Sequence, residues 1–179
     1  MRVQLIGASG TGKSTLGGEL SKRLGIPLLE VDRYYWADDD FRVKRSDEEK
    51  RAMLFADLAI HDSFVFTGAP QSFARGYPHD LDLIVFLRLN TEVRMNRLRQ
   101  RELLRYGARA LPEGDHYADT ESFLAWAATY ETSDDTVGNS LVSHRLLLSQ
   151  ATCPILELDA DWPVDELLED IIKELSTRL

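Results

Sequence analysis

A glycine-rich stretch at residues 7–14 constrains the fold of this chain more than any other feature. It reads G-A-S-G-T-G-K-S and matches the spacing G-x-x-x-x-G-K-S in full. A short β-prone run at residues 2–6 precedes it, and leucines recur every fourth residue after it, at positions 16, 20 and 24. That spacing places the leucines on one stripe of a helix. The stretch therefore predicts a strand, a tight glycine loop and a helix in immediate succession.

Such a loop is suited to binding phosphate. Glycines let the backbone fold closely around a phosphate group, so that successive N–H groups point at its oxygens and the start of the helix adds positive charge. Lys13 is expected to reach the β- and γ-phosphates, Ser14 to coordinate Mg²⁺ and Thr15 to hydrogen-bond a phosphate. The expected nucleotide-binding residues are Gly7, Ala8, Ser9, Gly10, Thr11, Gly12, Lys13, Ser14 and Thr15. A chance glycine-rich turn, the alternative, does not account for the strand and helix that flank the loop. We therefore expect the chain to bind a nucleoside triphosphate, ATP, together with Mg²⁺.

The rest of the chain alternates between short apolar runs and longer segments of helical periodicity. Further strands are expected at residues 28–31, 64–67, 83–89 and 155–158. Helices are expected at residues 46–60, 91–106, around 123–130, 140–150 and 163–179, with a polar loop at 107–119. Strands that alternate with helices need crossover connections. The pattern therefore predicts a three-layer, doubly wound α/β fold with a parallel sheet.

Composition excludes several other classes of protein. At 179 residues one domain, 1–179, is expected, and the net charge of −9 argues against a general nucleic-acid binder. The single cysteine, Cys153, excludes a disulfide framework and a cysteine zinc site, and fits a reducing cytoplasm. No apolar run approaches the roughly 20 residues that cross a bilayer, and the apolar stretch at the N-terminus is too short for a signal peptide. A cytoplasmic domain without a nucleic-acid or membrane partner is expected.

Phosphate-binding loops of this kind (P-loops) occur in several protein classes, and other segments distinguish among them. The chain has no N-K-x-D or T-K-x-D motif, which a GTPase would need to bind guanine. The third expected strand ends F-T-G at 66–68 and the fourth ends R-L-N at 88–90. Neither strand carries the acidic end expected of an AAA+ ATPase. Small kinases also have such a loop.

The chain resembles the adenylate-kinase-like family of small P-loop kinases over most of its length. The resemblance lies in GASGTGKST, LGIPLLEVD, the TGAP turn, LIVFLRL, an arginine-rich helix with a loop after it, and CPILELD. The segment VDRYYW is most similar to a bacterial branch of adenylate-kinase-related, topology-modulation-type proteins, and shikimate and gluconate kinases have a similar acidic second strand. The resemblance implies strand order 2-3-1-4-5, a small lid at about 107–119, and transfer of the γ-phosphoryl group of Mg-ATP to a small-molecule acceptor.

Departures from the family patterns bear on the acceptor. Where adenylate kinases have D-G-F-P-R, this chain has T-G-A-P-Q at 67–71, and where they have R-x-D-D it has T-S-D-D at 132–135. Both arginines are missing, which disfavours AMP. Shikimate kinases have D-x-D on the second strand, whereas here Asp32 is followed two residues later by Tyr34. That difference disfavours shikimate.

Asp32 is the first candidate for a catalytic residue outside the loop. It ends the second expected strand, whose carboxyl end should meet the crevice beside the loop. A carboxylate there can accept the proton of an acceptor hydroxyl or hold Mg²⁺ through water, and the resemblance favours both roles. The alternative is an aspartate that caps a turn. Glu30 alternates to the other side of the strand and is expected to be structural.

Arginines on the helix after the fourth strand form the second candidate group. Arg94, Arg97, Arg101 and Arg105 are spaced three, four and four residues apart, so they share one helix face, and we call them the arginine row. Guanidinium groups can stabilise the charge that builds on a transferring phosphoryl group. The resemblance assigns catalysis and phosphate binding to Arg97 and Arg101, with Arg109 joining from the lid. The alternative is a solvated face paired with Glu92 and Glu102, as expected for Arg99 on the opposite face.

Aromatic and histidine side chains are weaker candidates. Tyr34, Tyr35 and Trp36 could wall an acceptor pocket or belong to the core, and Trp162 could contact adenine or pack. We expect His144 to be structural, and Phe123, Trp126 and Tyr130 to be core. A regulatory module that binds nucleotide without transferring phosphate is the alternative function. The acceptor and the oligomeric state stay open.

Overall fold

Five parallel strands form the centre of the fold. A computed structural model describes residues 1–70, 73–74, 80–134 and 138–177. In this part of the chain the sheet has the order β2-β3-β1-β4-β5 and every neighbouring pair is parallel. The strands are β1 Arg2–Gly7, β2 Leu28–Glu30, β3 Phe64–Thr67, β4 Leu83–Arg88 and β5 Ile155–Asp159. The predicted strand order 2-3-1-4-5 and parallel sheet are confirmed.

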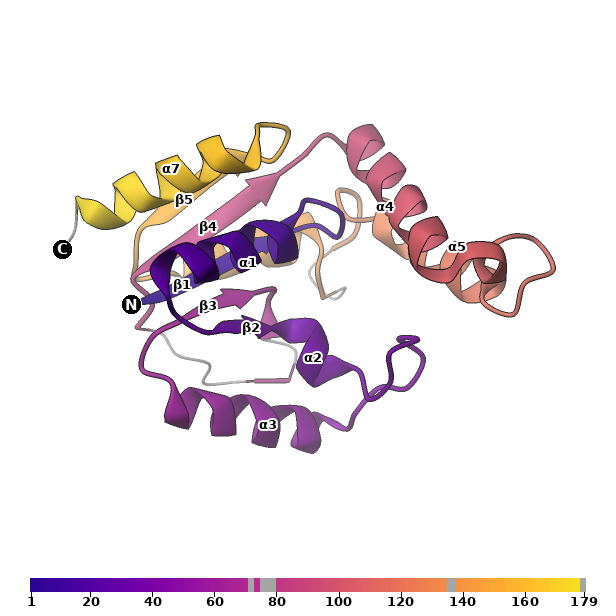
Figure 1. Cartoon of the computed structure of the whole chain (residues 1–179), viewed down its shortest axis with the longest axis horizontal. Coiled ribbons are helices and arrows are strands. Elements are labelled where there is room, and N and C mark those ends of the chain that lie inside the picture. Colours follow the sequence, from indigo (N-terminus) through magenta and orange to yellow (C-terminus); the bar gives the residue numbers. More distant parts are fainter. Residues whose placement is uncertain (71–72, 75–79, 135–137, 178–179) are drawn as a thin grey trace.

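Helices cover both faces of the sheet and give the predicted three layers (Figure 1). The helices of the described residues are α1 Lys13–Leu24, α2 Val31–Tyr35, α3 Asp47–Ile60, α4 Thr91–Tyr106, the 3₁₀ helix η2 Gly107–Ala110, α5 Tyr117–Ala128, α6 Leu141–Ser149 and α7 Val164–Ser176. Leucines and isoleucines of α1 and α7 pack on one face of the sheet, and α3 and α6 pack on the other. Helices α4 and α5 extend away from the sheet (Figure 1).

Local capping signals explain where several helices begin. Ser46 accepts a hydrogen bond from the backbone of Glu49, and the Glu49 carboxylate accepts one from the backbone of Ser46, so α3 starts with the predicted capping box. Asn90 accepts from the first turn of α4. Gly25 takes the left-handed conformation that ends α1. These ends are set by residues close together in the sequence.

Several element boundaries differ from the sequence expectation, those of β2 and α7 among them. Strand β2 ends at Glu30, so Asp32 lies in the first turn of α2 rather than on the strand. Helix α7 begins at Val164 and ends at Ser176, inside the expected span 163–179, of which residues 178–179 lie outside the described part. The carboxyl end of β2 still delivers Asp32 to the edge of the sheet where β1 enters the glycine loop, because the strands are parallel.

The expected lid, residues 107–119, contains more regular structure than a polar loop. It holds η2 and the first residues of α5. Arg109 bridges Asp40 at 2.8 Å and Asp115 at 2.9 Å, and Arg42 reaches Asp119 at 2.7 Å. These ion pairs attach the segment to residues 40–42. The lid role itself stays a prediction.

Among the described residues, no helix is both long and apolar enough to span a membrane.

Candidate functional site

The glycine loop leads directly from β1 into α1. Gly10 and Gly12 have φ of +88° and +87°, in the left-handed region that side chains with a Cβ rarely adopt. Gly12 is the N-cap of α1, and no side chain caps this helix end. The backbone N–H groups of the first turn therefore lack capping acceptors and can bind an anion. This is the geometry that the motif predicts.

Lys13 lies over its own loop. Its Nζ donates hydrogen bonds to the carbonyl oxygens of Gly7 at 2.9 Å and Ala8 at 2.8 Å. Burial lowers the pKa of Lys13 to about 8; the charge of Asp32 opposes this shift, and Arg101 and Arg94 add to it. The four side chains therefore share one electrostatic environment.

Asp32 lies near enough to Lys13 for its charge to oppose the lowering of the lysine pKa. Its side chain is exposed, and within the described residues its carboxylate makes no hydrogen bond or ion pair. The N-cap of α2 is Glu30, and no side chain caps that helix. The geometry therefore favours the catalytic interpretation of Asp32 over the turn-capping alternative. Its role stays a prediction.

Arg94 differs most from the expectation for the arginine row. Its side chain has no exposed surface. Nη1 donates to the carbonyl oxygen of Ala127 at 2.9 Å and to that of Ser9 at 3.4 Å, and Nη2 donates to both carboxylate oxygens of Glu131 at 3.2 and 3.0 Å. Arg94 therefore packs against the backbone of the loop and is not exposed on a phosphate-facing surface.

The other arginines of the row also diverge. Arg97 donates to the carbonyl of Ala160 and to the carboxylate of Asp161, both in the loop after β5. Arg101 pairs with its neighbour Glu102 at 2.8 Å. The guanidinium of Arg105 lies 4.5 Å from the centre of the Phe41 ring. Of the four, the structure brings Arg101 and Arg94 close enough to lower the pKa of Lys13.

Arg109, expected to join the phosphate site, is held between two carboxylates instead. Its ion pairs with Asp40 and Asp115 lower the pKa of both acids and keep its guanidinium charged. Engaging phosphate would require Arg109 to leave these partners.

The aromatic residues separate into core and surface. Tyr34 is fully buried, stacks on Phe66 and donates to Asp57, so it belongs to the core. Trp162 is 60% exposed, which argues against the packing role. The core expectation holds for Tyr130 and is wrong for Trp126, which is 39% exposed.

His144 is structural, as expected. It is buried, and its Nδ1 lies 2.8 Å from the hydroxyl of Tyr130. Burial lowers its pKa to about 4, so the ring is neutral near pH 7.

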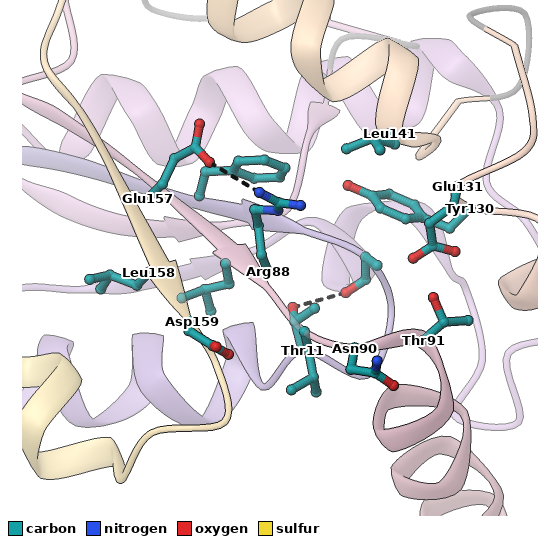
Figure 2. A pocket seen from close by; sticks show the side chains of 14 residues that line it. Thr11, Arg88, Asn90, Thr91, Tyr130, Glu131, Leu141, Glu157, Leu158 and Asp159 are labelled. Carbon is teal, nitrogen blue, oxygen red and sulfur yellow. Dashed lines mark hydrogen bonds and ion pairs between the residues drawn. The ribbon is translucent and has the colours of Figure 1, made fainter.

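A cavity of about 560 Å³ opens at the carboxyl ends of β4 and β5, behind the loop. Figure 2 shows Arg88 and Glu157 on one side of it and Tyr130, Glu131 and Leu141 on the other. Ala8 and Thr11 of the loop contribute to its wall, whereas Lys13, Asp32, Arg97 and Arg101 do not. The cavity therefore shares a wall with the loop but is separate from the expected catalytic groups.

The sequence did not lead us to expect that Arg94 contacts the loop backbone and pairs with Glu131. The sequence did contain one signal, because Arg94 is four residues before Leu98 and eight before Glu102, which puts the three on one stripe of a helix. In the structure all three side chains are buried. The partner Glu131 carries no such signal. Of the positions where adenylate kinases have the missing arginines, Gln71 lies outside the described residues, whereas Thr132 lies within them.

The predicted donors would supply only part of the coordination of a magnesium ion, and the nucleotide phosphates would supply further ligands. Within the described residues, no group of three or more His, Cys, Asp or Glu side chains could hold a metal. The hydroxyl of Ser14 and the free carboxylate of Asp32 are oxygen donors, which Mg²⁺ prefers, and Mg²⁺ commonly takes its remaining ligands from phosphate and water.

Comparison with known proteins places the chain in a family. Residues 3–109 match the model of the AAA_18 family, described as an AAA domain; this span runs from β1 to η2 and includes the P-loop, Asp32 and the arginine row. An uncharacterized protein of Bacillus subtilis, YqaC, is 37% identical over 175 residues, covering 98% of this chain and 97% of that protein. Shikimate kinase of Mycobacterium leprae is 32% identical over 107 residues, 54% of each chain.

Solved structures of small kinases share the fold at low identity. Deoxyadenosine kinase from M. mycoides with bound dATP has a TM-score of 0.59 at 15% identity, covering 98% of this chain and 100% of that one. Shikimate kinase from Bacteroides thetaiotaomicron has a TM-score of 0.58 at 20% identity, covering 98% of each. A gluconokinase from Sinorhizobium meliloti has a TM-score of 0.55 at 16% identity, covering 98% of this chain and 91% of that one. The chain thus belongs to the AAA_18 family, and its fold is the one that these small kinases share.

Proposed function

We propose that the protein is an ATP-dependent phosphotransferase that moves the γ-phosphoryl group of Mg-ATP to a hydroxyl of a small molecule. The observation that carries the proposal is the free carboxylate of Asp32, which shares its electrostatic environment with Lys13 and Arg101. A module that only binds nucleotide needs no acid to accept the proton of an acceptor hydroxyl. The P-loop kinase fold supports the same conclusion.

Each residue then has a role in the transfer. The backbone N–H groups of residues 7–15 hold the phosphates, and the Lys13 ammonium neutralises charge on the β- and γ-phosphates. Asp32 accepts the proton of the acceptor hydroxyl, whose oxygen forms the new bond to phosphorus as the bond to the β,γ-bridging oxygen breaks and ADP leaves. Arg101 meets the γ-phosphoryl oxygens.

Two further groups support binding. Arg97, which contacts the loop after β5, would bind the nucleotide phosphates, and Ser14 and Asp32 would hold the metal. Magnesium, when bound, neutralises charge on the phosphates and orients them.

The single Cys153 is half-buried and its pKa is raised by burial, which suits a thiol in a reducing cytoplasm.

A metabolite screen with ADP detection tests the proposal. The library should contain sugar acids, shikimate-type hydroxy acids and deoxynucleosides, because kinases of these groups share the fold. We expect one acceptor class to raise ADP release above the acceptor-free rate. Lys13→Ala should lower that rate about 10³-fold, the upper range for losing a group that stabilises developing charge. ATP binding without acceptor-dependent ADP release would instead favour the nucleotide-binding module.

A further inference from the structure

Arg94 joins three parts of the molecule that are distant in sequence. Its guanidinium contacts the carbonyl of Ser9 in the loop, the carbonyl of Ala127 at the end of α5 and the carboxylate of Glu131 beyond it. Ser9 is 85 residues away and Glu131 is 37 residues away. No other arginine of the row contacts the loop backbone through a hydrogen bond between described residues.

Burial of a guanidinium at this position costs free energy. Transfer of a charge from water into a protein interior is costly, and hydrophobic side chains of similar volume often serve as well or better for stability. Arg94 has one carboxylate partner, Glu131, whose side chain is 34% exposed, and its Nε has no hydrogen-bond partner among the described residues. Stability alone therefore does not account for an arginine here.

Contact with the loop backbone suggests what the charge accomplishes. In a trans peptide the C=O and the following N–H point in opposite directions. Because the carbonyl of Ser9 is directed toward Arg94, the N–H of Gly10 must point away from it. The side chain thus favours, through a hydrogen bond of 3.4 Å, one orientation of a peptide in the middle of the phosphate-binding loop.

Gly10 confirms how closely α4 supports the loop. A Cβ added at Gly10 would lie 2.9 Å from Cγ of Arg94, 2.9 Å from Cγ of Leu98 and 3.0 Å from the carbonyl oxygen of Arg94. By contrast, a Cβ added at Gly12 would meet nothing within 4 Å. The loop therefore rests on α4 at Gly10, where Arg94 also contacts it.

We propose that Arg94 is a positioning residue, which holds the peptide between Ser9 and Gly10 in its phosphate-binding orientation and links the loop to Glu131 at the wall of the cavity in Figure 2. The link to nucleotide binding rests on the proposed function, whereas the contact with the loop does not. Glu131 is the partly exposed end of this link.

The test compares Arg94→Met, Arg94→Lys and Glu131→Gln with Arg99→Met. Arg99 lies on the same helix, is exposed and contacts Asn96, so its substitution controls for the loss of one arginine from α4. Two quantities are measured: the affinity for Mg-ADP by calorimetry, and amide hydrogen exchange of residues 8–13 without nucleotide. Urea unfolding gives the global stability of each variant.

We expect Arg94→Met to weaken Mg-ADP binding about tenfold, the lower range for losing a hydrogen bond to a charged group. Exchange at residues 8–13 should rise by more than the change in global stability explains. Arg94→Lys should recover part of both losses, because an ammonium can reach one or two of the three acceptors but not all. Glu131→Gln should have a smaller effect of the same sign, and Arg99→Met none.

Wild-type loop exchange and wild-type affinity in Arg94→Met would overturn the proposal. So would loop exchange that rises only as far as global stability falls, since that result describes a purely structural arginine. If Arg94→Met does not fold, the same criteria apply to Arg94→Lys and Glu131→Gln. If the wild-type protein binds no Mg-ADP, the proposed function fails, and the exchange data still decide the role of Arg94.

Discussion

The P-loop and the arginine row of α4 meet at one site but are built in different ways. The loop consists of consecutive residues, and its shape follows from the glycines at positions 10 and 12 and from the start of α1. The arginines are spaced evenly on one helix, yet Arg94 is buried under the loop, Arg97 contacts the segment after β5, and Arg101 pairs with Glu102.

This difference shows how much a spacing of three or four residues on a helix can establish about the surroundings of side chains. It places side chains on one face, but each side chain then meets whatever packs at its own height along the axis. Successive members of the row lie three or four residues apart, about 5 to 6 Å along the helix, enough to reach different elements. One helix face can therefore contain both a buried support and exposed charges.

Asp32 tests the part of the site that only packing brings together. Asp32→Asn should lower turnover about 100-fold while leaving ATP affinity nearly unchanged, because a positioned base acts on the acceptor. Steady-state kinetics with the acceptor from the screen, together with ATP calorimetry, measures both. Wild-type turnover in this variant would remove Asp32 from the proposed mechanism and leave the P-loop assignment intact.

Alanine substitutions at Gly10 and Gly12 distinguish the cost of backbone strain in the loop from the cost of its packing against α4. Both have φ near +90°, so alanine at either position costs about 1 kcal/mol or more in backbone strain. Gly10→Ala also forces a Cβ against Arg94 and Leu98, adding about 2 kcal/mol of overpacking. Urea unfolding without nucleotide should therefore find Gly10→Ala the less stable variant by about 2 kcal/mol. Equal stability would show that α4 does not constrain the loop.

Substitutions of Arg97 and of Arg101 should change different kinetic constants, because the two arginines contact different parts of the molecule. Arg101→Ala should lower kcat about tenfold, as expected when an interaction with the transferring group is lost. Arg97→Ala should mainly raise the KM for ATP, because its partners Ala160 and Asp161 lie in the loop after β5. The sequence alone predicted an effect on kcat for both. Identical kinetic changes in the two variants would favour that simpler interpretation.

Lys13 gives the smallest expected effect, a dependence of ATP affinity on pH. The protonated ammonium binds phosphate, and its pKa without nucleotide is about 8, so affinity should fall as pH rises through that value. Between pH 7 and pH 8.5 the protonated fraction falls about fourfold. Three charged groups act on this pKa: Asp32 raises it, and Arg101 and Arg94 lower it. Calorimetry on Lys13→Arg should show weaker binding without this fall, because a guanidinium stays protonated.

Most of the fold could be predicted from the sequence because its signals are local. Apolar runs marked all five strands, and the capping box at Ser46 and Glu49 marked the start of α3. Strand β2 was placed one residue too long because Val31 is β-prone, and only the turn into α2 ends the strand there. Strand order came from resemblance to a family and not from the residues themselves.

The amino-acid sequence by itself identified the P-loop, since its glycines, Lys13 and the helix start are consecutive and favour this backbone conformation locally. Tertiary structure alone decided that Arg94 is buried, that Trp126 is 39% exposed and that Arg109 is paired with Asp40. Each of these outcomes depends on residues 33 to 85 positions away or on solvent, and a helical pattern carries no information about them. Local backbone preference is a property of neighbouring residues, whereas the partner of a side chain is a property of the packed molecule.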